Sequence, residues 1–201
     1  MRKKNNIFTP VLLNIIIVIL INALGSFMHF RYDLTSEKKH TLSKETEKIL
    51  SGSDDLIYVK VFLKGEYPAG FKRLEKQSHE ILENFKNIAE KKLDFEFINP
   101  SESSSETERN EVYKQLVSQG LKPTDLQVKK QDGMSSSIIF PGAIIYYKEK
   151  FAAVELLKKE IGLPPEVALN NSVEALEYEL ISAISKLTKN KKEKIAFLQG
   201  H

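Results

Sequence analysis

The side chains that most often do chemistry are few in this sequence of 201 residues, and they are scattered along it. The four histidines are His29, His40, His79 and His201. No two of them are four residues apart, and none lies beside an acidic pair with the spacing of a metal site. His79 falls in a helical pattern, and we expect it on the surface. His201 follows a predicted strand, where loops often contact ligands, or it only marks the end of the given chain.

Other kinds of reactive site are also missing from the sequence. Cysteine is absent, which excludes disulfides, thiol nucleophiles and zinc–thiolate centres. No glycine-rich nucleotide motif, P-loop, serine-hydrolase motif or set of kinase motifs occurs. The serine-rich stretch 101–105 is explained by helix capping. The sequence therefore predicts no catalytic residue, no cofactor and no metal, and we expect a protein that is not an enzyme.

The net charge of +3 comes from the first few residues. Arg2, Lys3 and Lys4 are the only charged residues before Arg31, so residues 31–201 carry 27 basic and 27 acidic side chains. No stripe of basic residues interleaved with aromatic residues occurs, so the sequence predicts no nucleic-acid partner.

A long apolar stretch organises the start of the chain. Residues 7–30 contain no Asp, Glu, Lys or Arg. As a helix they would reach roughly 36 Å at about 1.5 Å per residue, enough to cross a hydrocarbon core of about 30 Å. We expect a cytoplasmic tail at residues 1–6, because basic residues favour that side, and a transmembrane anchor at 7–30. The chain would cross the bacterial inner membrane once, with its main domain in the periplasm. A cleaved signal peptide is the alternative, with Ala23-Leu24-Gly25 as the small-x-small triplet.

Five residues in and just after this span are candidate contacts with membrane partners. Asn14 and Asn22 share a broad face of the predicted helix, and an amide in lipid gains from finding a partner. The alternative is that the helix is only an anchor, and that it tolerates the two Asn side chains without a partner helix. Arg31, Tyr32 and Asp33 follow at the level of the lipid headgroups, where a charged tip and an amphipathic ring are stable.

The rest of the chain has the pattern of a folded α/β protein. We expect residues 31–52 to be a juxtamembrane segment, with a short helix over 44–50 capped by Ser43. Residues 53–165 then follow the order β-α-β-α-β-β-α. The predicted elements are strand 57–63, helix 71–89, strand 93–98, a helix from Ser103 to Gln119, strand 126–128, strands within 138–147 and at 151–154, and a short helical stretch at 156–161. The first strand–helix–strand predicts a parallel pair with a right-handed crossover.

This order resembles a thioredoxin-like domain, here without redox cysteines. In that fold the proline before the late strand is commonly cis, which makes Pro141 the candidate cis-proline. Gly162 to Pro165 reads as a domain boundary. We expect residues 166–201 to supply a helix capped around residues 170–172 and then the first strand of a second, truncated α/β domain, at 194–198.

Several short motifs together resemble one known family. They are Arg31-Tyr32-Asp33-Leu34-Thr35, Thr41-Leu42-Ser43, Phe71-Lys72-Arg73-Leu74, Phe97-Ile98-Asn99-Pro100, Ile139-Phe140-Pro141-Gly142-Ala143 and Lys194-Ile195-Ala196-Phe197-Leu198-Gln199-Gly200-His201. In order and spacing they resemble the N-terminal part of GldG, the gliding-motility-associated ABC transporter component of Bacteroidetes. The resemblance covers essentially the whole chain.

The resemblance implies a set of partners and a role. The partners would be an ABC permease and a cytoplasmic ATPase, and the domain would be an auxiliary or substrate-binding-like, non-catalytic periplasmic subunit. It would bind a substrate of unknown identity or couple the transporter to the envelope. The alternatives are an independent membrane-tethered binding or sensor module, and a tethered enzyme whose site lies outside this chain.

Overall fold

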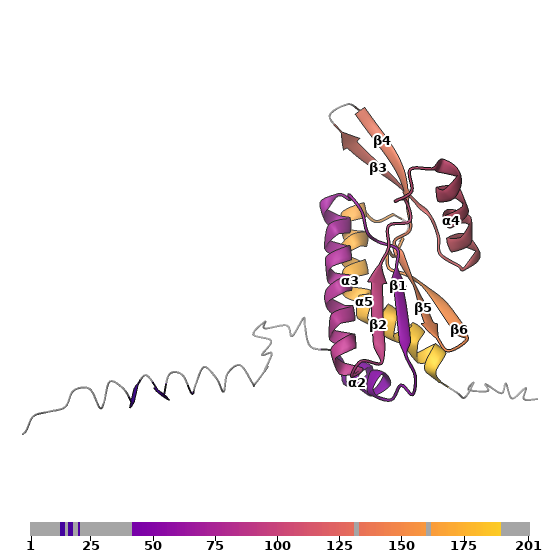
Figure 1. The fold of residues 1–201 in the computed structure, drawn as a ribbon. Helices are drawn as coiled ribbons and strands as arrows, with labels where there is room; N and C mark the ends of the chain where they lie inside the picture. Colours follow the sequence, from indigo (N-terminus) through magenta and orange to yellow (C-terminus); the bar gives the residue numbers. More distant parts are fainter. Residues whose placement is uncertain are drawn as a thin grey trace, which may run out of the picture. The chain divides into compact units, whose positions relative to one another are not determined.

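The computed structural model describes residues 13–14, 16–17, 20, 42–130, 133–159 and 162–189. The contacts between residues divide the chain between Thr41 and Leu42. All the labelled elements belong to the unit that begins at Leu42, and this unit is described by itself below (Figure 1).

The described elements begin as helix, strand, helix, strand and helix, continue with four consecutive strands and end with a helix. They are α2 (Lys44–Ser51), β1 (Ile57–Val61), α3 (Ala69–Ile88), β2 (Leu93–Phe97), α4 (Glu106–Ser118), β3 (Thr124–Lys130), β4 (Gly133–Ile139), β5 (Gly142–Tyr147), β6 (Lys150–Glu155) and α5 (Pro165–Thr188). Four strands form one sheet in the order β2-β1-β5-β6. The pair β1–β2 is parallel, as predicted, whereas β1–β5 and β5–β6 are antiparallel. Strands β3 and β4 form a separate two-stranded sheet that extends away from the main one (Figure 1).

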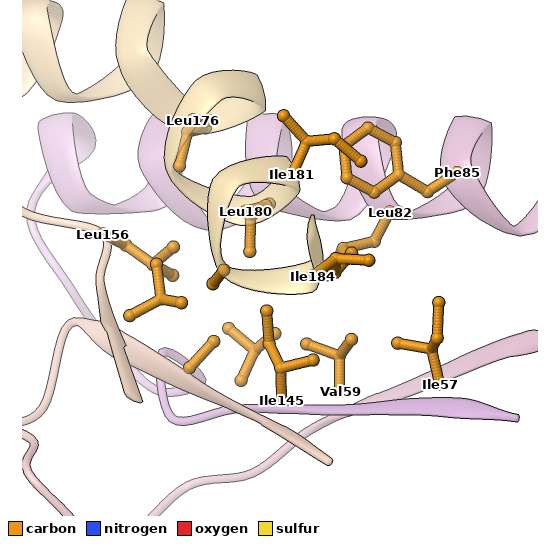
Figure 2. Packing of buried hydrophobic residues seen from close by; sticks show 14 of the residues in the cluster. Ile57, Val59, Leu82, Phe85, Ile145, Leu156, Leu176, Leu180, Ile181 and Ile184 are labelled. Carbon is orange, nitrogen blue, oxygen red and sulfur yellow. The ribbon is translucent and has the colours of Figure 1, made fainter. Parts of the chain in front are cut away.

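One face of the sheet is covered by α3 and α5, which lie side by side (Figure 1). Strand β1 turns Ile57, Val59 and Val61 toward these helices, and all three are fully buried. Figure 2 shows the side chains of the strands meeting those of the two helices in one continuous layer. Burying an aliphatic or aromatic side chain of this size contributes about 1.5–3 kcal/mol. This layer therefore holds most of the apolar stabilisation of the unit.

The opposite face of the sheet is covered only in part. Helix α4 lies over one end of it (Figure 1). A second, smaller buried cluster forms there from Phe62, Leu116, Leu121, Phe140 and Ile144. Phe62, directly after β1, is buried in this cluster and makes this side of the strand end apolar. Farther along the same face, the side chain of Phe151 on β6 stays 50% exposed.

Helix α2 confirms one local prediction and corrects a boundary. Ser43 caps the helix by accepting a hydrogen bond from the Thr46 amide, as expected. The helix does not stand apart as part of a juxtamembrane segment 31–52, because Leu50 is fully buried in the main core. The hydroxyl of Thr46 and the amide of Ser43 both donate to Glu177 on α5.

Helix α5 overturns the expected boundary between residues 165 and 166. Its apolar side is buried in the same core as β1 and α3, so it completes this domain instead of opening a second one. The helix also begins at Pro165, earlier than a cap at residues 170–172 would allow. A proline at the first helical position needs no amide partner, which explains the early start. Asn170 instead accepts a hydrogen bond from Arg73 on α3.

Three smaller predictions also change. Helix α4 begins at Glu106 and is capped by Ser105, whose hydroxyl accepts from the Glu108 amide, so the cap predicted at Ser103 is wrong. Strand β4 begins at Gly133, ahead of the strands predicted within 138–147, because pairing with β3 satisfies its backbone. No helix forms at 156–159, where the Leu156 and Leu157 amides donate to the Pro141 carbonyl.

The backbone at Pro141 also differs from the expectation. The described residues contain no cis peptide bond, so Pro141 is trans. For a bond before proline, the trans form is lower in energy than the cis form by about 0.5–1 kcal/mol, and the loop at Pro141 accommodates the trans form.

Among the residues that the structure describes, no helix is both long and apolar enough to cross a membrane.

A candidate binding groove at the edge of the sheet

Strand β2 is one of the two edges of the four-stranded sheet. In its parallel pairing with β1, the Lys92 carbonyl accepts from Ile57 and the Ile98 amide donates to Val61. This register directs the backbone groups of the even-numbered residues toward β1. The amides and carbonyls of Phe95 and Phe97 therefore point to the open edge. Nothing described elsewhere in the chain pairs with β2 on that side.

Aromatic rings line the α3 side of this edge. Phe95 and Phe97 are only partly buried, and both pack against the main core. The ring of His79, on α3, stacks on Phe97 at 5.5 Å and meets Phe95 edge-on at 5.3 Å between ring centroids. The two phenylalanine rings are themselves 6.0 Å apart in a T-shaped arrangement. Such pairs contribute about 0.5–1.5 kcal/mol beyond burial, so the three rings form a defined apolar surface.

A charged clasp crosses the edge beside Phe95. One carboxylate oxygen of Asp94 accepts hydrogen bonds from the Phe95 amide at 3.0 Å and from the Lys86 ammonium at 2.8 Å. The ammonium of Lys86 also lies 5.8 Å from the centroid of the Phe95 ring. The clasp thus occupies the outward amide of Phe95, in the way that natural sheets protect an edge with charged side chains.

Together these elements enclose a groove of about 870 Å³. Its walls are the outer side of α3, the β2 edge and the end of β1. The lining residues are Lys64, Lys72, Glu75, Lys76, His79, Glu80, Phe95, Glu96 and Phe97. Most charges are paired across or along the walls, with Lys72 3.5 Å from Glu75, Lys76 3.8 Å from Glu80, and Glu96 3.4 Å from Lys60.

The resolved pKa shifts keep these groups in their ordinary ionisation states. The hydrogen bond from Lys86, followed by that from the Phe95 amide, lowers the pKa of Asp94. The same contact with Asp94 raises the pKa of Lys86. Near the groove, burial raises the pKa of Tyr67 to about 12, with Glu75 adding to the effect. All three shifts move away from neutral pH, so near pH 7 Asp94 and Lys86 stay charged and Tyr67 stays neutral.

A second, more apolar depression of about 480 Å³ lies between α4 and the β3–β4 sheet. Tyr113, Val117, Ile138 and Phe140 are among its lining residues, and Val117 and Ile138 are 49% and 44% exposed. It has fewer polar groups than the β2 groove to orient a ligand, and it is the weaker candidate site.

The residues singled out from the sequence lie elsewhere. Asn14 is helical, and its described neighbours Leu13, Ile16, Ile17 and Leu20 are large exposed apolar residues. Asn22, Arg31, Tyr32, Asp33, His201, most of the span 7–30 and the strand expected at 194–198 lie outside the described residues. His79 is exposed, as predicted, but it belongs to the aromatic surface of the groove.

The groove itself was not found from the sequence, although a signal was present. The strand Leu93-Asp94-Phe95-Glu96-Phe97 alternates apolar and acidic residues, which is typical of a strand with one face exposed. The sequence does not reveal which strand ends at the edge of the sheet. Across the described parts of the chain, no group of three or more His, Asp or Glu side chains has the geometry to hold a metal ion.

Comparison with known proteins gives two findings. The model of DUF7088, a domain of unknown function, matches residues 36–146. An uncharacterized protein of Borreliella burgdorferi (strain B31) is 24% identical over 200 residues, which is all of this chain and 35% of the relative. The chain thus spans about a third of the length of this curated relative. No solved structure matches the chain.

Proposed function

The chain belongs to the DUF7088 family, and we propose that it is a membrane-anchored, non-catalytic subunit of an ABC-type transporter complex associated with gliding motility. In this proposal the N-terminal segment 7–30 anchors it in the bacterial inner membrane. The folded unit lies in the periplasm and binds a partner or substrate through the β2 groove.

The observation that carries the binding role is the groove at the β2 edge. It combines unpaired outward backbone groups, three packed aromatic rings and paired fixed charges. Unpaired strand-edge backbone groups beside apolar side-chain pockets are the features by which proteins bind extended peptide segments.

The finer fold assignment is part of the same proposal. We infer a thioredoxin-like domain used as a scaffold. Support comes from the order β2-β1-β5-β6, from β5 running antiparallel to β1, and from the parallel strand–helix–strand at its start. The sheet also has two helices on one face and one on the other.

The membrane role draws on the N-terminal residues. Leu13, Ile16, Ile17 and Leu20 are helical and 44–59% exposed, a surface that suits a lipid or helix environment better than water. The transporter partners come from the resemblance of the sequence motifs to GldG. We propose an ABC permease and a cytoplasmic ATPase as partners.

Purification of the full-length protein from native membranes in mild detergent tests the proposal. We expect an ATPase and a permease to be recovered with it in fixed ratio. Replacing both Asn14 and Asn22 by leucine should leave membrane insertion intact and weaken that recovery. Repeated recovery of the protein alone would contradict the transporter role and favour an independent tethered binding module.

A further inference from the structure

The two outward backbone positions of β2 differ in how well they are protected. At Phe95 the amide is held by Asp94, and Lys86 closes the clasp. At Phe97 no such side chain caps the outward amide among the described residues. The edge is therefore open at the Phe97 end and guarded at the Phe95 end. An incoming strand can begin to pair at Phe97 before the clasp is displaced.

The two sides of this edge also differ in chemistry. Successive side chains of a strand point to opposite faces. Phe95 and Phe97 face the α3 side together with His79, whereas Asp94 and Glu96 leave the strand on the other side. Both carboxylates stay partly exposed at the edge, although that of Asp94 turns back to Lys86 on α3 and that of Glu96 pairs with Lys60 on β1. A strand added here would place alternate side chains against an aromatic surface and against two carboxylates. The complementary sequence alternates apolar and basic residues.

We propose that β2 accepts an extended segment of a partner protein, with alternating apolar and basic side chains, as a fifth strand of the sheet. The proposal rests on the binding role assigned to this groove above and names its ligand. Backbone hydrogen bonds to Phe95 and Phe97 supply the affinity. The groove selects the apolar side chains, and Asp94 and Glu96 select the basic ones.

A second copy of this chain fits the edge poorly. In an antiparallel pair of β2 strands centred on Phe95, Asp94 of one copy would face Glu96 of the other. Like charges directly opposite each other destabilise a strand pair. The acidic side of β2 therefore disfavours self-pairing and favours a basic strand.

The clasp adjusts the affinity of the edge for this ligand. Binding at Phe95 requires the Asp94 carboxylate to leave the amide, and Lys86 holds it there at 2.8 Å. A basic side chain of the incoming strand takes over the place of Lys86 beside Asp94. Removing Lys86 should thus expose the edge without removing any group that contacts the ligand backbone.

The test uses the full chain in detergent at near-physiological salt, with fluorescently labelled peptides as probes. One blocked ten-residue peptide alternates lysine and valine, and its control alternates glutamate and valine. We expect saturable binding of the lysine peptide, at least about tenfold tighter than the glutamate peptide. Equal binding of the two peptides would overturn the proposal.

A matched pair of variants isolates the backbone contact. Phe97→Ala and Phe97→Pro both remove the ring, but only proline also removes the outward amide, which makes no bond to β1. We expect Phe97→Pro to bind the lysine peptide about tenfold more weakly than Phe97→Ala. Circular dichroism and thermal unfolding of both variants verify the fold. Equal affinity of two folded variants would overturn strand addition.

Two further measurements complete the test. Lys86→Ala should tighten binding of the lysine peptide about threefold, and unchanged or weaker binding would contradict displacement of the clasp. Sedimentation of the chain alone should show no dimer that depends on the β2 edge. A dimer that Phe97→Pro abolishes would mean that a second copy of the chain binds this edge, and would contradict the proposal. Peptide binding uses the purified chain alone, so its failure is distinguishable from failure to recover the permease and ATPase.

Discussion

The two faces of the four-stranded sheet are built for different purposes. On one face, α3 and α5 cover the strands along their length and bury a large continuous core (Figures 1 and 2). On the other face, α4 covers one end and buries only five hydrophobic residues, and an exposed aromatic side chain remains beyond it. Most of the apolar burial that stabilises the unit therefore lies on one side of the sheet. The second face and the edges can then vary and bind at little cost to folding.

The largest expected effect is on the α3–α5 face. Phe85 is fully buried in the main core, so Phe85→Ala removes its transfer free energy and leaves a cavity that the two helices cannot close. We expect the free energy of unfolding to fall by about 3–5 kcal/mol, measured by urea denaturation. A loss below about 1 kcal/mol would contradict the assignment of the main stabilising layer.

A smaller loss is expected on the α4 face. Leu116 is 3% exposed within the five-residue cluster, and α4 can shift toward the sheet to fill part of the space that it leaves. Leu116→Ala should cost about 2–3 kcal/mol, at the low end for buried leucine. Amide hydrogen exchange should quicken in α4 while α3 and α5 stay protected. Equal acceleration in all three helices would show that the two faces unfold as one unit.

The smallest effect concerns the clasp at the β2 edge. The pKa of Asp94 is lowered in the folded protein, chiefly by Lys86, so its contribution to stability is present above the unfolded pKa of about 3.9. It is lost as the pH falls through the lower folded pKa. Lys86→Ala should raise the pKa of Asp94, as followed by NMR titration of its carboxyl carbon. An unchanged pKa would mean that the clasp does not form in solution.

Much of the fold follows from local sequence signals. The helical stripe from Phe71 to Phe85, the β-branched strand at β1 and the Ser43 cap were each predicted and are each observed. In these elements a strong periodicity or a capping side chain agrees with the tertiary packing. Family membership rests on the match to residues 36–146, which ends within β5, before α5 closes the core.

The errors arose where long-range packing decides the outcome. Gly162 to Pro165 has the composition of a domain linker, yet Pro165 begins a helix whose apolar side belongs to the core already formed. The groove escaped prediction for the same reason. The order of strands in a sheet makes β2 an edge, and its alternating residues alone do not show this.

Residue-resolved amide exchange of the chain, with and without the lysine–valine peptide, directly tests whether β2 is the binding edge. If the β2 edge is the binding surface, the Phe95 and Phe97 amides should become protected on binding, while amides of β6 and α4 stay unchanged. Protection at β6 or at α4, with no change along β2, would show that the peptide binds elsewhere and would contradict strand addition at β2.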